Sequence, residues 1–498
     1  MKRLIFIASA LVAAVAAMAA VKPVAMAAVK PAAMAAVKST AMAAVKAASL
    51  TPETVRTATE LRDRIAAGSK AADWVRDITD LAGPRMPGSA GDRAAVAVTL
   101  AMLKAQGFSN VRAEKVIVPV WERGVETGEV LSPARQKLVL TALGGSIGTP
   151  EGGLEGEVVR FRSLEELALA GSSARGKIAF IDRPTARTSD GSGYGSAGDV
   201  RGRGASAAAR QGAIGLLIRS IGTDDERAPH TGGMRYEDDA PKIPAAALAA
   251  PDAALLTRLL ARGPVKVKFT LGCRTLPDGE SANVIGEIPG RELPGEIVLL
   301  GAHLDSWDLG TGALDDAAGC GIVVEAARQI GQLPKKPRRT IRVVLFANEE
   351  NGLKGGKTYA EAHAAELPSH VAAFEADLGQ GPALGISWNA GPSAEAILKA
   401  IAGLLAPISA DSLVANDIGG ADLIYLIPSG MPNLGLLLDA TDYFDYHHTA
   451  NDNYDRIDPK ILDQSTAAAA VIAYVLAEAD APLERIPSEK RVLPSWAR

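Results

Sequence analysis

Histidine and carboxylate side chains stand at the ends of several predicted strands in the second half of the chain. They are His303, Asp305, Asp315, Asp316, Glu349, Glu350, Asp377, His447 and His448. One polar residue at a strand end often caps the next helix, but capping does not account for metal-ligand residue types at several strand ends. Carboxylates and imidazoles suit zinc, and a carboxylate can bridge two ions that activate a water molecule. The pattern therefore predicts a metal-dependent hydrolase.

A water molecule activated in this way also needs a base that accepts its proton and does not itself bind metal. The doublet Glu349-Glu350 can supply both functions, because one glutamate can bind metal while the other acts as the base. The residue types alone leave open which glutamate has which role.

The sequence after residue 276 alternates apolar strands with helices. The predicted strands span residues 282–288, 296–303, 340–350, 372–379 and 433–440. Nearly continuous apolar strands joined by helices indicate a sheet that is covered on both faces, and therefore an α/β fold with a mixed, largely parallel sheet. In such sheets the ligand site lies beyond the carboxyl ends of the strands. The histidines and carboxylates stand at this edge.

Two segments precede this predicted catalytic domain, which spans residues 276–480. Residues 51–127 contain amphipathic helices on both sides of a turn-rich stretch at 83–92, and we expect these helices to cover the sheet. Residues 128–275 consist of short strands separated by turns, which indicates an inserted domain. Residues 481–498 are predicted to form a C-terminal tail.

The amino-terminal 50 residues are typical of an exported protein. Lys2 and Arg3 precede an uncharged, alanine-rich run of 18 residues, which predicts a secretory signal peptide over residues 1–20. A membrane anchor is the alternative, because 18 residues can just span a bilayer. Residues 21–50 repeat an octapeptide of the form VKPVAMAA and are predicted to be a low-complexity tether. We expect a periplasmic or extracellular protein without stable membrane insertion after signal cleavage.

The composition limits the partners of the chain. It has 498 residues, of which 48% are apolar and 22% are charged, which allows two or three domains with sizeable cores. The first 50 residues hold six basic side chains and no acidic one, so acidic residues outnumber basic ones by ten in the remainder. This balance argues against nucleic acid and anionic lipid as partners. Cys273 and Cys320 can form at most one bridge, and an unpaired cysteine is more often a buried apolar residue.

Several motifs resemble those of the co-catalytic zinc exopeptidases, a family that includes bacterial leucyl aminopeptidases and glutamate carboxypeptidases. The motifs are GAHLDSWDLGTGALDDAAG, FANEENG, FEADLG and the HHT of YFDYHHTANDNYDRID. The carboxypeptidase Q branch of the family is similar in three further motifs, GPRMPGS, VPVWERG and GGSIGTPEGG. The resemblance extends from about residue 51 to about residue 480. It implies a zinc exopeptidase fold interrupted by a protease-associated domain at residues 128–275, dipeptides or short peptides as substrates, and a homodimer.

The resemblance also implies a role for each residue at the strand ends. One zinc ion would be bound by His303, Asp315 and Asp377, and a second by Asp315, Glu350 and His448, with Asp315 as the bridge. Glu349 would be the general base for a zinc-bound hydroxide that attacks the scissile carbonyl, and it would return the proton to the leaving amine. Asp305 would orient the imidazole of His303. The peptide bond between Asp315 and Asp316 is a candidate cis bond.

His447 stands where the aminopeptidase members of the family have a tyrosine that stabilises the oxyanion. The chain shares this departure with the carboxypeptidase Q branch, and His447 is a candidate oxyanion donor, with a purely structural role as the alternative. Either His447 or His448 could be the zinc ligand, and His448 is favoured because the family ligand precedes Thr or Ser. Asp452 is expected to support or cap the backbone rather than to bind metal.

Other interpretations are an aminopeptidase of the same family, a catalytically silent binding protein on the same fold and a single-zinc acyltransferase of the same superfamily. The complete set of ligands and the base argue against the silent protein. A G-x-G-x-x-G match at 193–198 and a G-x-S-x-G match at 144–148 lack the strand-to-helix context that dinucleotide binding or a serine nucleophile requires. We expect His363 and His370 to be exposed, and His230 is a candidate to approach the cleft from the inserted domain.

Overall fold

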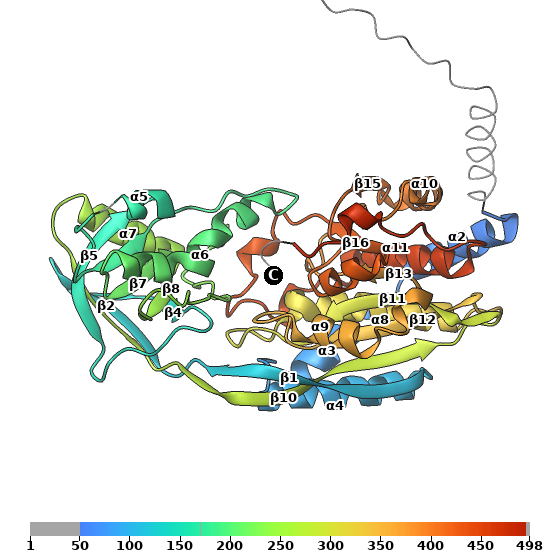
Figure 1. Ribbon diagram of the computed structural model, residues 1–498, viewed down its shortest axis with the longest axis horizontal. Helices are drawn as coiled ribbons and strands as arrows, with labels where there is room; N and C mark the ends of the chain where they lie inside the picture. Colours follow the sequence, from blue (N-terminus) through green and yellow to red (C-terminus); the bar gives the residue numbers. More distant parts are fainter. Residues whose placement is uncertain (1–49, 170, 495–498) are drawn as a thin grey trace, which may run out of the picture. The chain divides into compact units, whose positions relative to one another are not determined.

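The computed structural model describes residues 50–169 and 171–494 (Figure 1). The predicted signal peptide and, apart from Leu50, the predicted repeat tether lie outside these residues. Three helices come first in the described chain, α2 (Pro52–Ala66), α3 (Ala71–Ala82) and α4 (Ala90–Ala105). The hydroxyl of Thr51 accepts a hydrogen bond from the backbone N–H of Thr54 at 3.1 Å, and Pro52 occupies the first turn of α2. This cap follows from the Thr-Pro sequence.

The first sheet has eight strands, and its order is β1-β10-β12-β11-β13-β16-β14-β15. The bounds are β1 Ser109–Glu122, β10 Arg274–Ile288, β11 Leu293–His303, β12 Arg339–Phe346, β13 His370–Glu375, β14 Ala383–Asn389, β15 Ser412–Ala415 and β16 Asn433–Leu438. β11 pairs in parallel with β12 and β13, and β13 pairs in parallel with β16. The pairs β1/β10, β10/β12 and β14/β16 are antiparallel. The prediction of an α/β fold with a mixed, largely parallel sheet is confirmed, and the parallel pairs include those at the centre of the sheet.

Helices cover both faces of the first sheet (Figure 1). One face packs against α2, α3, α4, α8 (Ala318–Gly331), α10 (Ala394–Leu405) and α11 (Pro459–Glu478), and the other against α9 (Lys354–Ala362) and the 3-10 helix η4 (Asp422–Ser429). β12 is buried along its whole length, as a strand between two helical layers must be. Within the described ranges, α11 is the one helix long and apolar enough to span a membrane, and 83% of its most apolar stretch is buried inside the protein.

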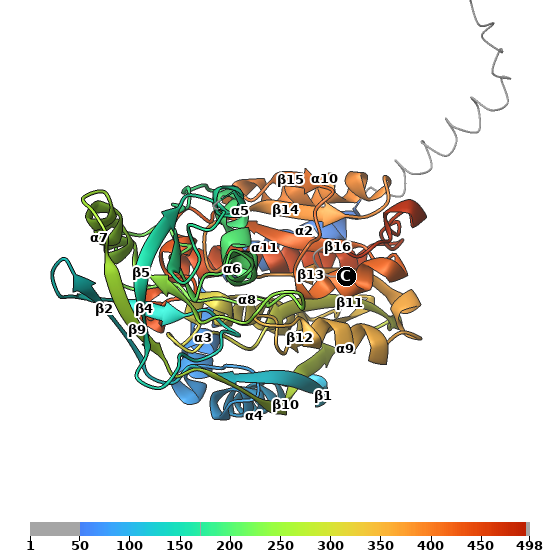
Figure 2. The same cartoon turned by 60° about the vertical axis from the view of Figure 1, so that its left-hand side comes forward.

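A second eight-stranded sheet is formed by the chain between β1 and β10 (Figure 1, Figure 2). Its order is β3-β2-β9-β5-β6-β7-β8-β4, with β2 Glu126–Ser132, β3 Gln136–Leu138, β4 Leu140–Ala142, β5 Leu154–Phe161, β6 Ile178–Ile181, β7 Gly215–Arg219, β8 Ala245–Leu248 and β9 Lys266–Leu271. The helices α5 (Leu164–Ala168) and α6 (Ser192–Arg210) pack on one of its cores, and α7 (Ala250–Leu260) packs on the other. The domain bounds 128–275 stay a prediction.

The two long strands β1 and β10 connect the two sheets. They pair in antiparallel fashion from Ser109 and Glu287 to Glu122 and Arg274. The chain leaves the first sheet through β1, builds the second sheet, and returns through β10. The second sheet is therefore attached by two neighbouring strands.

The parallel strands bring the predicted site residues to one edge of the first sheet. β11 ends at His303, β12 ends three residues before Glu349, and β13 ends two residues before Asp377. The segment that follows β16 carries His447 and His448. Because β11, β12, β13 and β16 run in the same direction, their carboxyl ends meet at one edge. The segment η1 (Ala313–Ala317), in which Asp315 and Asp316 have non-helical backbone angles, adds Asp315 before α8 begins.

Candidate active site

Two groups of potential metal ligands lie at this edge and share Asp315. In the first group, His303 Nε2 lies 3.1 Å from Asp315 Oδ1 and 3.6 Å from Asp377 Oδ1. In the second group, His448 Nε2 lies 3.1 Å from Asp315 Oδ2 and 3.0 Å from Glu350 Oε2. The two oxygens of Asp315 therefore face different histidines.

His447 also lies in the second group, and its ring stacks on that of His448 with the ring centres 3.5 Å apart. Its Nε2 atom lies 3.4 Å from Asp315 Oδ2. His448 contacts two carboxylates of the group and His447 one. The structure brings all the residues predicted from the strand ends into one place.

The donor atoms fit a divalent cation. Within the described residues, the buried atoms Asp315 Oδ2, Glu350 Oε1 and His447 Nδ1 have no hydrogen-bond partner. Burial of such polar atoms is costly unless a metal ion or a water molecule satisfies them. Imidazole nitrogens and carboxylate oxygens are the ligands that zinc and similar ions take in proteins.

The carboxylates repel one another electrostatically. Burial raises the pKa of Glu349 well above its usual value, and the nearby carboxylates of Asp377 and Glu350 raise it further. Burial, followed by the charge of Asp315, also raises the pKa of Glu350. A cation at this position would favour the charged form of each carboxylate. The arrangement is therefore electrostatically complementary to a positive ion.

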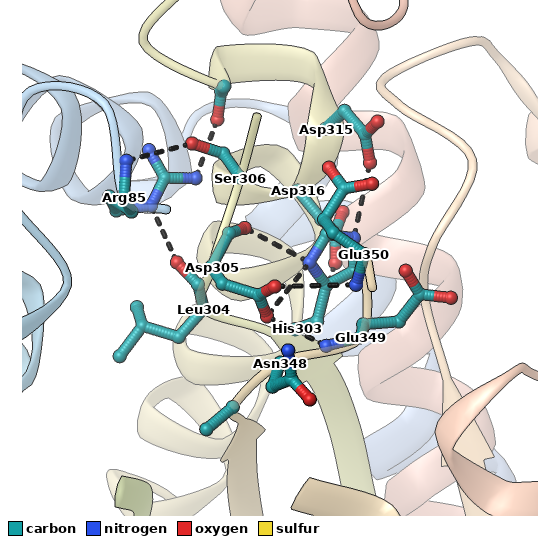
Figure 3. Close-up of polar contacts among 12 residues, drawn as sticks. Arg85, His303, Leu304, Asp305, Ser306, Asp315, Asp316, Asn348, Glu349 and Glu350 are labelled. Carbon is teal, nitrogen blue, oxygen red and sulfur yellow. Dashed lines mark hydrogen bonds and ion pairs between the residues drawn. The ribbon is translucent and has the colours of Figure 1, made fainter. Parts of the chain in front are cut away.

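Asp305 joins the ends of β11 and β12. Its carboxylate oxygens accept hydrogen bonds from the backbone N–H groups of Glu349 at 2.9 Å and Glu350 at 3.3 Å (Figure 3). Its backbone carbonyl lies 3.0 Å from His303 Nδ1, whereas its carboxylate lies 3.7 Å from that nitrogen. Because a carbonyl only accepts, Nδ1 carries the hydrogen and Nε2 is free to bind metal. The resemblance assigned Asp305 to His303 alone, and the structure adds the two glutamates.

Arg85 supports the loop between His303 and Asp315 (Figure 3). Its side chain is fully buried, and its guanidinium donates to the backbone carbonyls of Leu304 at 2.5 Å, Gly312 at 2.8 Å and Thr311. The sequence analysis did not identify this residue. An arginine within GPRMPGS gives no sign of its partners, which lie more than 200 residues away.

Two further carboxylates hold the backbone around Asp315. Asp452 accepts from the backbone N–H groups of Leu314 at 2.7 Å and Asp315 at 3.2 Å, as the predicted supporting role requires. Burial raises the pKa of Asp452 to about 7. Asp316 accepts from the backbone N–H of His303 at 3.1 Å and from that of Gly319 at 2.9 Å. The Asp315-Asp316 peptide bond is cis, as the resemblance implied.

A cavity of about 840 Å³ opens beside Glu350, between the first sheet and the second. Its walls include Trp121, Gly145, Arg203, Arg235, Asn351 and Tyr425. Arg203 and Arg235 are exposed and form no ion pair within the described residues, whereas Glu237 in the same wall is paired with Arg210. Sequence reasoning found no basic pocket, because Arg203 lies on α6 and Arg235 between β7 and β8, and both reach the cavity beside Glu350 only in the folded chain.

Two histidines outside the strand ends are less exposed than predicted. The expectation that His363 and His370 are exposed is wrong. His370 is fully buried, and its Nε2 lies 2.8 Å from the hydroxyl of Tyr359. His363 is mostly buried between the carboxylates of Glu114 and Glu366.

The structure also places His230 and the two cysteines. His230 reaches the ligand loop, since its Nδ1 lies 2.7 Å from the backbone carbonyl of His447. Cys273 and Cys320 are buried and free, so the two cysteines do not form a bridge.

Known proteins resemble the chain over most of its length. A model described as peptidase family M28 matches residues 283–473. Carboxypeptidase Q from Mus musculus is 37% identical over 82% of this chain and 86% of its own, and that from Homo sapiens is 35% identical over 82% and 85%. A crystal structure of a peptidase M28 precursor from Shewanella amazonensis has a TM-score of 0.85 at 46% identity, covering 87% of this chain and 99% of that one. A zinc aminopeptidase from Bacillus subtilis, 22% identical with a TM-score of 0.60, shares the fold over 84% and 98%.

This likeness agrees with the fold and with the ligand groups at the edge of the first sheet. Together they define a metallo-exopeptidase, a hydrolase of peptide bonds. The chain belongs to peptidase family M28.

Proposed function

We propose that the chain is a two-zinc exopeptidase that hydrolyses dipeptides or short peptides. One ion would be held by His303, Asp315 and Asp377, and the other by Asp315, Glu350 and His448. The observation that carries this proposal is the orientation of Asp315, whose Oδ1 faces His303 and whose Oδ2 faces His448, each at 3.1 Å. A carboxylate with one oxygen in each of two ligand groups suits a bridge between two ions.

The chain's own residues supply the acid-base chemistry. When bound, the two ions would lower the pKa of a water molecule and polarise the scissile carbonyl. Glu349 would accept the proton of that water and return it to the leaving amine. Asp305 would keep Glu349 in place through the hydrogen bond to its backbone N–H at 2.9 Å.

His447 would donate a hydrogen bond to the oxyanion that develops on the substrate. Burial, followed by the charge of His448, lowers the pKa of His447 well below its usual value. A neutral imidazole carries one N–H, and His447 Nδ1 has no hydrogen-bond partner within the described residues. In the tautomer that carries its hydrogen on Nδ1, the ring would direct a donor toward a substrate.

The cavity beside Glu350 favours substrates with a free carboxyl terminus. Arg203 and Arg235 line a space of about 840 Å³ and form no ion pair within the described residues, and a guanidinium group suits the geometry of a carboxylate. The relatives named carboxypeptidase Q point in the same direction. An aminopeptidase is the second candidate, because a zinc aminopeptidase shares the fold.

The proposal also covers the cellular location of the enzyme, the role of its second sheet and its oligomeric state. The basic residues and apolar run at the amino terminus support export to a periplasm or to the outside of the cell. The second sheet would be the protease-associated domain, which covers the cleft and selects short substrates. The homodimer implied by the resemblance is part of the proposal, and sedimentation of the purified protein tests it.

The first experiment is a measurement of metal content together with hydrolysis of dipeptides and aminoacyl amides, before and after chelation. Two zinc ions per chain and chelator-sensitive cleavage confined to dipeptides support the carboxypeptidase Q-like function. Cleavage of the amides favours the aminopeptidase. A chain with no bound metal and no turnover overturns the proposal in favour of a silent binding protein.

A further inference from the structure

The loop that carries His447 and His448 is held by the second sheet's part of the chain. The backbone N–H of Thr231 donates to the carbonyl of His448 at 3.0 Å, and the backbone N–H of Thr223 donates to the carbonyl of Phe444 at 3.0 Å. The residues from 220 to 233 thus contact the backbone of the ligand loop at Phe444, which precedes the two histidines, and at His448 itself.

His230 contributes the contact nearest to His447. Its ring is buried, with 1% of its surface exposed, and Nδ1 lies 2.7 Å from the backbone carbonyl of His447. Because a carbonyl can only accept, Nδ1–H is the donor. The other ring nitrogen lies 2.8 Å from the carboxylate of Asp224. The hydroxyl of Ser220 accepts a hydrogen bond from the backbone N–H of His230 at 2.9 Å.

The same segment approaches His448 closely enough to exclude a side chain. Gly232 has a positive φ of 127°, and a Cβ atom at this position would lie 2.7 Å from His448 Nδ1 and 2.6 Å from Arg201 Cζ. The carbonyl of Thr231 lies 3.4 Å from His448 Nδ1. An acceptor on this side favours the hydrogen on Nδ1 and leaves Nε2 toward the carboxylates of Asp315 and Glu350.

We infer that His230 and Asp224 are positioning residues of the metal centre, which fix the ligand loop from the second sheet and so determine how tightly the His448 group holds its ion. This inference rests on the proposed two-zinc function. His230 acts through the backbone of His447 and belongs to neither of the two proposed ligand sets. The second sheet is then a structural part of the metal centre as well as a cover.

The test is a zinc competition assay on the full chain with a chelator of known affinity. In His230→Ala, we expect the affinity for one of the two zinc ions to fall roughly 10- to 100-fold, the range found when groups that orient metal ligands are removed. The kcat is expected to fall with that ion and to recover in excess zinc, while the KM for a dipeptide stays unchanged. A purely structural role of His230 would not produce recovery by zinc.

The matched control is His363→Ala, which removes another mostly buried histidine between carboxylates, Glu114 and Glu366. This variant is expected to keep both zinc ions at wild-type affinity. If His230→Ala does not fold, Asp224→Ala gives the same readout, because it removes the group that contacts Nε2 of the ring and leaves the ring itself.

The outcomes separate the two proposals. One outcome is that the wild-type chain binds two zinc ions and the variants of His230 and Asp224 bind both ions equally tightly. This result overturns the positioning role and leaves the proposed function intact. A wild-type chain that binds no zinc overturns the proposed function and this inference with it. Loss of one ion in His230→Ala, but not in His363→Ala, supports the inference.

Discussion

The carboxylate of Asp305 lies 2.9 Å from the backbone nitrogen of Glu349, and this contact ties the end of β11 to the segment after β12. The carbonyl of the same residue faces His303 Nδ1. One residue therefore positions both His303, a proposed metal ligand, and Glu349, the proposed base. Hydrogen bonds of this kind fix the backbone segments that carry catalytic side chains and so keep those side chains close together.

Glu349→Gln is expected to abolish turnover while both metal ions stay bound. The substitution removes the proton acceptor and keeps the size of the side chain, so the ligands are undisturbed. We expect kcat to fall roughly 100- to 10,000-fold, the contribution of a general base. Metal analysis and dipeptide hydrolysis on the same sample check this result. Loss of zinc from this variant would show that Glu349 is a ligand.

Asp315→Asn is expected to deplete both metal sites. The amide nitrogen replaces one of two carboxylate oxygens that face His303 and His448, and the negative charge between the two groups is lost. Zinc content measured after dialysis should fall below one ion per chain. Two tightly held ions in this variant would exclude Asp315 as the bridge.

Arg85→Met is expected to destabilise the chain and to weaken metal binding together. The carbonyls of Leu304 and Thr311 lose their donor, whereas that of Gly312 keeps the backbone N–H of Ala317. Each unsatisfied acceptor costs about 1 to 3 kcal/mol, so the free energy of unfolding should fall by at least about 2 kcal/mol. Urea titration and zinc competition measure the two effects. Wild-type stability would rule out the supporting role of Arg85.

Arg235→Ala and Arg203→Ala are expected to raise the KM for dipeptides by roughly tenfold each, because a charged hydrogen bond to the substrate carboxylate is lost. The kcat should change little. Arg210→Ala is the control, since the guanidinium of Arg210 is occupied by Glu237 and Asp239. An unchanged KM in both variants would remove this cavity from substrate recognition.

The buried His370 is expected to lower the free energy of unfolding at acidic pH. Burial lowers its pKa to about 4 from an ordinary value of 6.5. As the pH falls, His370 takes up a proton in the unfolded chain before it does so in the folded chain. The free energy of unfolding therefore keeps its full value above pH 6.5 and decreases as the pH falls to 4. The loss amounts to about 3 kcal/mol at roughly 1.4 kcal/mol per pKa unit.

Urea unfolding with chelator present at every pH, so that metal release does not contribute, checks this expectation. The comparison is His370→Gln, which has no group that titrates in this range. The wild type should lose about 3 kcal/mol more than the variant between pH 7 and pH 4. Equal losses in the two proteins would contradict the assignment.

The strand-end residues could be predicted from the sequence because their strands are short, apolar and close together in the chain. The direction of β11, β12 and β13 follows from the helices between them, and parallel strands place their carboxyl ends together. His303, Glu349 and Asp377 were therefore expected to meet.

Contacts between distant segments could not be predicted in this way. His230 and His447 are 217 residues apart, and nothing in the local pattern of either segment indicates the other. His370 follows polar residues in the sequence, which favoured an exposed side chain. It is buried because it begins β13, and Tyr359 and the carbonyl of Glu366 satisfy both nitrogens of its ring.

Glu122 and Arg274 face each other as paired residues of β1 and β10, where the chain leaves the first sheet and returns to it. A tight turn could replace the residues from 126 to 271 without changing the register of the two strands. Such a miniaturised enzyme would retain every ligand in its sequence. It would lose Thr231 and its neighbours, which contact the loop that carries His447 and His448, and under our inference it would hold the second ion less tightly. The strand register permits excision of the second sheet, whereas the proposed two-zinc centre depends on that sheet.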